Sequence, residues 1–138
     1  MIDLTTDFGH RVEKRLWDEW IIWLTTSGSD LTPQPRPVWF YWNGLDFLIF
    51  SRPDTHKLRH ISVRPLVSLH LDSDGRGGDI VVFTGLARIL ENAPPAEEVE
   101  IYLEKYRVGL KRLDLTPEAF AQRYRIAIRV TPETLRGH

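Results

Sequence analysis

The part of this sequence best suited to chemistry is a strand that ends in hydroxyl and cationic side chains where a helix begins. Ser51 and Thr55 offer hydroxyl donors, and Lys57 adds a positive charge. The free backbone N–H groups and the positive dipole end of a helix N-terminus favour a bound phosphate. Residues 51–57 therefore predict a phosphate site, and the alternative is a capped surface helix with solvated basic residues.

Other polar residues do not form a recognisable catalytic or metal-binding set. His56 and His60 have the four-residue spacing of zinc ligands but lack the intervening glutamate and a third ligand, so we predict no metal site. The sequence shows neither a serine-histidine-aspartate arrangement nor a convincing carboxylate pair, and it contains no cysteine. No catalytic residue can be named, and any redox chemistry must come from a bound cofactor.

The composition is that of an ordinary globular protein. The chain has 138 residues, of which 42% are hydrophobic and 27% charged, and this fits one domain spanning residues 1–138. A formal net charge of -1 argues against nonspecific nucleic-acid binding. No apolar run approaches the roughly 20 residues of a membrane helix, and the first residues lack a basic segment followed by an apolar one. We expect a cytoplasmic protein that binds neither nucleic acid nor membrane.

The elements that must position residues 51–57 are mostly strands. Alternating and β-branched residues predict strands at 20–26, 38–42, 45–50, 66–71, 80–90 and 124–130, with an extended, proline-rich edge or entry segment at 32–37. Helical spacing predicts helices at 8–20, 55–63 and 94–110, the first capped by Asp7, and Thr116 caps a further helix that starts at Pro117. The fold class is mainly β (α+β), a six-stranded antiparallel barrel with flanking helices.

Two short features of the strands predict local geometry. Asn43 and Gly44 predict a tight hairpin turn in which both residues have positive φ. Gly85, inside the long strand 80–90, predicts a β-bulge.

The ordered set of motifs resembles the pyridoxamine-phosphate-oxidase-like family along nearly the whole chain. Residues 49–69, including Arg64-Pro65-Leu66-Val67-Ser68-Leu69, look like the cofactor-phosphate region of that family. The segments on either side are also similar, namely Trp23-Leu24-Thr25-Thr26, residues 35–40, Gly77-Gly78-Asp79-Ile80 and Gly85-Leu86-Ala87. Residues 102–106 and 124–132 resemble a deazaflavin-dependent branch more specifically.

The resemblance implies a fold, an assembly and a set of binding residues. The fold is the FMN-binding type of split β-barrel, and the assembly is a homodimer with the cofactor at its interface. The residues implied to hold the cofactor phosphate are Ser51, Thr55, His56 and Lys57. Those implied to flank the ring are Val38, Trp39 and Phe40, and Arg36 aligns with a flavin-contacting arginine although Pro35 and Pro37 depart from the oxidase pattern.

The activity implied by the resemblance is that of an oxidoreductase dependent on the deazaflavin F420, which transfers hydride to a small organic acceptor. An FMN-binding oxidoreductase and a noncatalytic flavin, deazaflavin or haem carrier remain alternatives. Arg52, Arg59 and Arg64 either serve the acidic tail of a deazaflavin or are ordinary surface charges. We do not expect vitamin B6 oxidation, because residues 136–138 lack a clear equivalent of the basic residues that hold pyridoxal phosphate in the oxidases.

Overall fold

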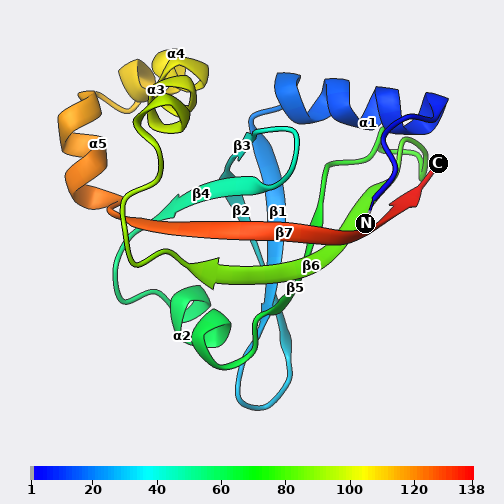
Figure 1. The fold of residues 1–138 in the computed structure, drawn as a ribbon, viewed down its shortest axis with the longest axis horizontal. Coiled ribbons are helices and arrows are strands. Elements are labelled where there is room, and N and C mark those ends of the chain that lie inside the picture. Colours follow the sequence, from blue (N-terminus) through cyan, green and yellow to red (C-terminus); the bar gives the residue numbers. More distant parts are fainter. Residues whose placement is uncertain (1) are drawn as a thin grey trace.

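The computed structural model describes residues 2–138, which form seven strands and five helices (Figure 1). In chain order the elements are α1 (Asp7–Asp18), β1 (Ile21–Ser27), β2 (Pro33–Trp39), β3 (Tyr41–Trp42), β4 (Phe47–Ser51), α2 (His56–Val63), β5 (Leu66–His70), β6 (Val81–Ile89), α3 (Ala96–Lys105), α4 (Arg107–Arg112), α5 (Pro117–Arg123) and β7 (Ile126–Gly137).

The strands make one antiparallel sheet in the order β2-β1-β5-β6-β7-β4-β3. The sheet curls strongly, so that β1 and β2 cross the direction of β4, β6 and β7 (Figure 1). The result is a half-barrel with helices at its margins. The α+β class with an antiparallel, curled sheet is as predicted.

The predicted number of six strands is wrong, because residues 33–39 and 41–42 form two strands separated by a bend at Phe40. The backbone N–H of Phe40 donates to the hydroxyl of Tyr106 at 2.8 Å. The carbonyl of Phe40 accepts from the ammonium of Lys105 at 2.8 Å and from the Tyr106 hydroxyl at 2.9 Å. Both backbone groups of Phe40 therefore bind side chains at the end of α3 instead of a neighbouring strand.

The proline-rich segment is the edge strand that the sequence predicted. Pro35 and Pro37 of β2 lie opposite Thr25 and Trp23 of β1, and β2 has no other neighbour in the sheet. An edge strand tolerates prolines because half of its N–H groups need no partner in the ladder.

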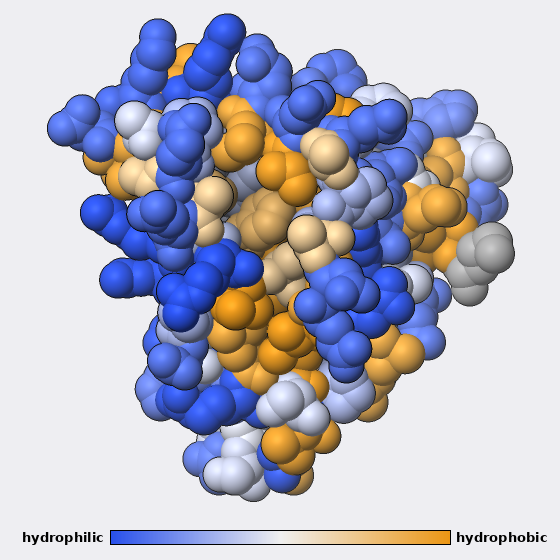
Figure 2. Space-filling model, turned by 60° about the vertical axis from the view of Figure 1, so that its left-hand side comes forward, coloured by the Kyte–Doolittle hydropathy of each residue, from blue (hydrophilic) through white to orange (hydrophobic). Residues whose placement is uncertain are grey.

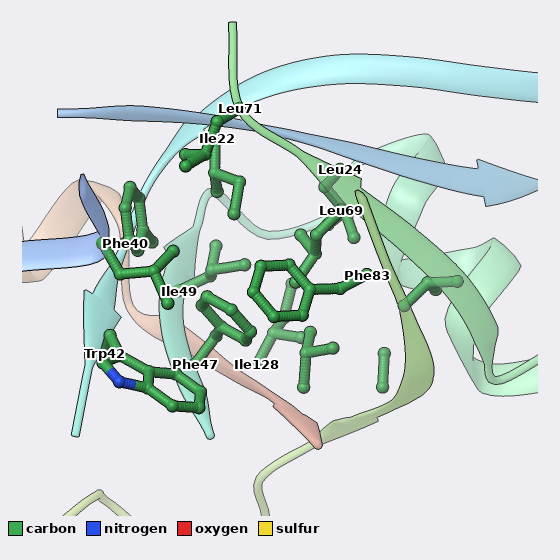
Figure 3. Packing of buried hydrophobic residues seen from close by; sticks show 14 of the residues in the cluster. Ile22, Leu24, Phe40, Trp42, Phe47, Ile49, Leu69, Leu71, Phe83 and Ile128 are labelled. Carbon is green, nitrogen blue, oxygen red and sulfur yellow. The ribbon is translucent and has the colours of Figure 1, made fainter. Parts of the chain in front are cut away.

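The core fills the concave side of the sheet with aliphatic and aromatic side chains (Figure 3). Phe47 lies at its centre, with ring centroids 5.2 Å from Phe83, 6.0 Å from Phe40 and 4.7 Å from Trp42. All four side chains are buried. Truncating such a ring to alanine typically costs about 3–5 kcal/mol of stability, so this cluster contributes much of the driving force for folding.

The helices differ from the prediction at two positions. Thr6, rather than Asp7, caps α1, with its hydroxyl accepting from Gly9 N at 2.9 Å. The predicted helix 94–110 breaks at Tyr106, where φ is −103° and ψ is 13°, because the Tyr106 side chain is bound to the backbone of Phe40 and ends α3 there. The cap at Thr116 is confirmed, with its hydroxyl accepting from Ala119 N.

Turn geometry is confirmed at one position and corrected at the other. Gly85 lies at a register shift between β6 and β7, and a Cβ there would lie 2.2 Å from the carbonyl oxygen of Thr131. Gly44 has a φ of 95°, but Asn43 does not have positive φ. The Asn43 side chain instead accepts from the backbone N–H groups of Leu45 and Asp46, which stabilises a longer connection than the predicted two-residue turn.

No helix within residues 2–138 combines the length and the apolar character that crossing a membrane requires.

Candidate functional site

A groove with two adjoining chambers lies between β1–β2, the end of β4 and the helices. The aromatic chamber, about 320 Å³ in volume, is lined by Ile21, Pro37, Val38, Trp39, Phe50, Ser51, Arg52, Thr55, Lys57, Tyr102, Leu113, Phe120 and Tyr124. The polar chamber, about 640 Å³, is lined by Thr26, Gly28, Ser29, Asp30, Gln34, Arg36, Pro37, Thr55, His56, Lys57 and His60. Pro37, Thr55 and Lys57 line both, so the two chambers adjoin each other at these residues. Figure 2 shows the side bearing α3–α5, where hydrophobic residues lie in a hollow between hydrophilic rims.

Packed rings fix the walls of the aromatic chamber. Trp39 stacks on Tyr106 with ring centroids 4.3 Å apart and planes 3° apart, and Phe120 lies 5.9 Å from Trp39. Phe50 meets Tyr102 edge to face at 4.8 Å. Side chains packed in this way have little rotational freedom, so the chamber presents preformed aromatic surfaces to a ligand.

The Trp39 ring is positioned by Tyr106 and Gly109, which lie three residues apart at the start of α4. The bond of Tyr106 to Phe40, the next residue in the chain, fixes the backbone that carries Trp39. Gly109 of α4 approaches the ring so closely that a Cβ there would lie 3.1 Å from Cζ2 of Trp39. The glycine therefore allows α4 to pack directly behind the indole.

Hydroxyl groups and a cation meet where the two chambers join. Ser51 is buried at the end of β4, and its hydroxyl donates to the Arg52 carbonyl at 2.9 Å and lies 3.3 Å from the Thr55 hydroxyl. Thr55 precedes the first turn of α2, and its side chain makes no capping hydrogen bond. The first N–H groups of α2 therefore have no side-chain acceptor at Thr55, as an anion site requires.

Lys57 contributes a positive charge to this junction. Burial lowers the pKa of Lys57, and the positive charge of Arg36 lowers it further. Within residues 2–138 neither cation forms an ion pair, and Arg36 donates only to the carbonyl of its neighbour Pro35. Two nearby cations without a counterion repel each other, so a bound anion would be stabilised at this point.

The sequence of residues 9–138 matches the family model described as pyridoxamine 5'-phosphate oxidase. The chain belongs to this family. The resemblance inferred from the motifs is confirmed, while no curated protein matches the sequence.

Solved structures with the oxidase-family fold resemble the chain over nearly its full length. A candidate pyridoxamine 5'-phosphate oxidase of Listeria innocua is 20% identical, with a TM-score of 0.71 and coverage of 92% of this chain and 94% of that one. A structure described as an F420 reductase is 24% identical, with a TM-score of 0.65 and coverage of 90% and 94%. HutZ, described as a haem storage protein of Vibrio cholerae, is 14% identical, with a TM-score of 0.66 and coverage of 96% and 95%. At these identities the likenesses show the fold alone.

The structure brings together most of the residues that the family resemblance implied. Those lining the aromatic chamber are Val38, Trp39, Ser51, Thr55 and Lys57. Those lining the polar chamber are Arg36, Thr55, His56 and Lys57. Phe40 lines neither chamber, because its side chain is buried among the core residues in Figure 3.

Several lining residues of this family member were not singled out from the sequence. Tyr102, Phe120 and Tyr124 wall the aromatic chamber; Tyr102 and Tyr124 belong to the segments that resemble the deazaflavin-dependent branch, but no binding role was assigned to them. Thr26 and His60 lie in the polar chamber, 34 residues apart in the chain. Thr26 belongs to a segment that resembles the family, and His60 follows His56 by one helical turn, but no signal in the sequence joins the two residues.

Proposed function

We propose that this protein is an F420-dependent oxidoreductase that transfers hydride between the deazaflavin and a small organic acceptor. The observation that carries the proposal is the two-chamber groove, in which an aromatic chamber and a polar chamber meet at Lys57 and Thr55. That arrangement matches a ligand with a planar ring, a phosphate and an acidic tail. Membership of a family named for an oxidase supports the reaction class.

The residues of the aromatic chamber fit a flat conjugated ring. Trp39, Tyr102 and Phe120 offer ring surfaces, and Ile21 and Val38 add aliphatic contacts. Cavities of about 300 Å³ or more are typical of small-molecule sites, and aromatic pairs favour offset stacking.

The junction between the chambers fits a phosphate. The hydroxyls of Ser51 and Thr55, the N-terminus of α2 and the ammonium of Lys57 meet there. The lowered pKa of Lys57 reflects the cost of holding that charge away from water. A phosphate would offset the cost with a charge-assisted hydrogen bond.

The size of the polar chamber favours F420 over FMN. At about 640 Å³ it extends well beyond the junction, and Arg36, His56 and His60 line it. FMN ends at its phosphate, whereas a deazaflavin continues into a tail that carries carboxylates. FMN remains the second candidate, because the ring chamber and the junction suit both cofactors.

The role of the protein in this chemistry is to bind and orient the cofactor and to exclude water from the site. The deazaflavin, when bound, supplies the hydride. Trp39, packed against Tyr106 and Gly109, offers a plane against which a ring packs. Burial raises the pKa of Tyr102 well above its usual value, so its hydroxyl stays neutral in the chamber wall. The rate enhancement then comes from holding the cofactor and the acceptor in a reactive geometry, and no protein nucleophile is needed.

Haem binding has less support from this groove. Within the described chain, the histidines that line it, His56 and His60, belong to the polar chamber, and the residues around the aromatic chamber include no histidine. A haem carrier would place an axial ligand beside the apolar slot.

The test is equilibrium binding of F420 and FMN to the purified protein, followed by fluorescence, with Lys57→Ala and the exposed-site control Lys111→Ala. We expect tight F420 binding that Lys57→Ala weakens by about 1.5–3 kcal/mol and Lys111→Ala leaves unchanged. Preference for FMN would move the protein to the flavin branch, and binding of neither cofactor would refute the proposal. Turnover of reduced F420 with an acceptor panel then separates an enzyme from a noncatalytic carrier.

A further inference from the structure

The floor of the polar chamber is formed by a histidine held on a buried hydroxyl. His60 lies on the inner side of α2, and its Nδ1 is 2.9 Å from the hydroxyl of Thr26 in β1. Thr26 is only 2% exposed. A buried partner at hydrogen-bond distance fixes the plane of the imidazole, and Thr26 and His60 both line the chamber.

The other nitrogen of this ring lies over the backbone of Gly28. A Cβ on Gly28 would lie 3.1 Å from Nε2 of His60 and 3.6 Å from Oδ1 of Asp30, so the missing side chain leaves space beside this nitrogen that the Asp30 carboxylate also borders. Gly28 also lines the polar chamber, and no hydrogen bond to Nε2 is formed within residues 2–138. The ring thus has one nitrogen at hydrogen-bond distance from Thr26 and one that forms no hydrogen bond within the described residues.

The hydroxyl of Thr26 suits both charge states of the imidazole. In the neutral ring the hydroxyl donates to Nδ1, and Nε2 carries the proton that faces the chamber. In the protonated ring Nδ1–H donates to the hydroxyl oxygen, and Nε2–H still faces the chamber. Because a hydroxyl can either donate or accept, His60 presents an N–H donor in both states.

The charged groups that line the chamber with His60 are two cations and one carboxylate, so their balance is positive and favours an anionic ligand. Asp30, in the β1–β2 connection, is the acidic residue of the chamber, and its carboxylate already accepts from Thr32 N at 3.0 Å. This hydrogen bond lowers the pKa of Asp30, and the charge of His60 adds a smaller lowering. His56, with its ring 6.2 Å from that of His60, and the cations Arg36 and Lys57 complete the set.

We propose that His60, held by Thr26, binds a carboxylate of the ligand beyond its phosphate, and that this binding draws a proton onto the imidazole. The inference rests on the proposed function and deepens it by assigning the carboxylate contact to one residue. A carboxylate at Nε2 stabilises the charged ring, and the hydroxyl oxygen of Thr26 accepts a hydrogen bond from the protonated Nδ1. The chamber would therefore select ligands that carry a carboxylate in addition to a phosphate.

The test measures F420 and FMN binding by calorimetry near neutral pH, in two buffers that differ in ionisation heat. F420 should bind the wild type with net proton uptake, and His60→Gln should bind F420 about tenfold more weakly and without that uptake. FMN, which has no carboxylate, should bind both proteins equally. Thr26→Val should reduce the proton uptake, whereas Thr25→Val, the same change on the opposite face of β1, should not.

The outcomes separate this inference from the proposed function. F420 binding by the wild type with unchanged affinity and proton uptake in His60→Gln would overturn the assignment of His60 alone. An equal loss of FMN and F420 binding in His60→Gln would overturn it too, because a damaged α2 would affect the shared phosphate site. A wild type that does not bind F420 would overturn both.

Discussion

The hydroxyl of Tyr106 binds the backbone of Phe40, 66 residues away in the chain. It accepts from the Phe40 N–H at 2.8 Å and lies 2.9 Å from the Phe40 carbonyl oxygen. The same hydroxyl lies 2.7 Å from the carbonyl of Trp20. One side chain at the end of α3 thereby stabilises both the bend between β2 and β3 and the start of β1. Because Trp39 precedes this bend and stacks on the Tyr106 ring, the bond also shapes the aromatic chamber.

Tyr106→Phe should therefore destabilise the protein and weaken ligand binding in the aromatic chamber. The ring remains, but the buried N–H of Phe40 loses its acceptor, and an unsatisfied buried donor costs about 1–3 kcal/mol. Urea unfolding measures the loss. Tyr41→Phe is the control, because the Tyr41 hydroxyl has no hydrogen bond within the described residues, and it should change stability by less than about 0.5 kcal/mol. Equal stability of the two variants would show that the Tyr106 hydroxyl is not needed at this bend.

This contact also shows what sequence reasoning could not reach. Local patterns predicted the strand pairs around Leu69 and Phe83, the bulge at Gly85 and the cap at Thr116, because alternation and capping depend on neighbours in the chain. The break at Phe40 depends on a residue 66 positions away. Nothing in residues 38–42 distinguishes such a bend from a continuous strand.

The candidate site also combines residues that the sequence could predict with residues that it could not. Ser51, Thr55 and Lys57 could be singled out because a strand end followed by a helix start is a local signal. The contact of His60 with Thr26 arises from the packing of α2 on β1, which the sequence does not specify. The family resemblance implied that Phe40 flanks the ring, but its side chain lies in the core together with that of Trp42.

Glu98→Gln should lower stability at neutral pH, and the loss should disappear in acid. Both carboxylate oxygens of Glu98 accept from Arg129 at 2.9 Å, and Arg129 is only 7% exposed. This hydrogen bonding lowers the pKa of Glu98, so its contribution is present above the unfolded pKa of about 4.5 and is lost as pH falls through the lower folded value. We expect a loss of about 1–2 kcal/mol at pH 7 by chemical unfolding.

Glu97→Gln is the matched control for that experiment. Glu97 is the preceding residue of α3, is exposed, and forms no ion pair within residues 2–138. Its substitution should be nearly neutral at every pH. A Glu98→Gln loss that persists unchanged at pH 3 would contradict the electrostatic explanation.

Because of Lys105, the free energy of unfolding should increase as pH rises from about 8 to about 10. Burial lowers the pKa of Lys105 to about 8, while nearby Glu19 and Asp18 oppose the shift. Between that value and the unfolded value of 10.5, the unfolded chain binds the extra proton, so the free energy of unfolding increases with pH. Above pH 10 the trend reverses, because burial raises the pKa of Tyr102 and Tyr106 and only the unfolded tyrosines ionise.

The measurement is the free energy of unfolding of wild type and Lys105→Met at intervals between pH 7 and 10. The wild type should gain about 1–3 kcal/mol over this window, and Lys105→Met should lack the gain. Lys111→Met, which changes an exposed lysine of α4, should retain it. A parallel rise in wild type and Lys105→Met would assign the pH dependence to another group.

A second copy of the chain should cover the outer face of β5 and β6. Leu66 and Leu86 lie directly opposite each other on these strands and are 66% and 42% exposed, and Val63 at the end of α2 is 68% exposed. Exposed apolar side chains on a sheet face favour an interface, and the family resemblance implies a homodimer. Leu66→Glu should convert a dimer into a 16.1 kDa monomer, as measured by light scattering after gel filtration.

Leu45→Glu adds the same charge at a side chain that is 79% exposed in the β3–β4 connection, and it should leave the dimer intact. A monomeric wild type, or a Leu66→Glu variant that remains dimeric, would show that this face is not the interface.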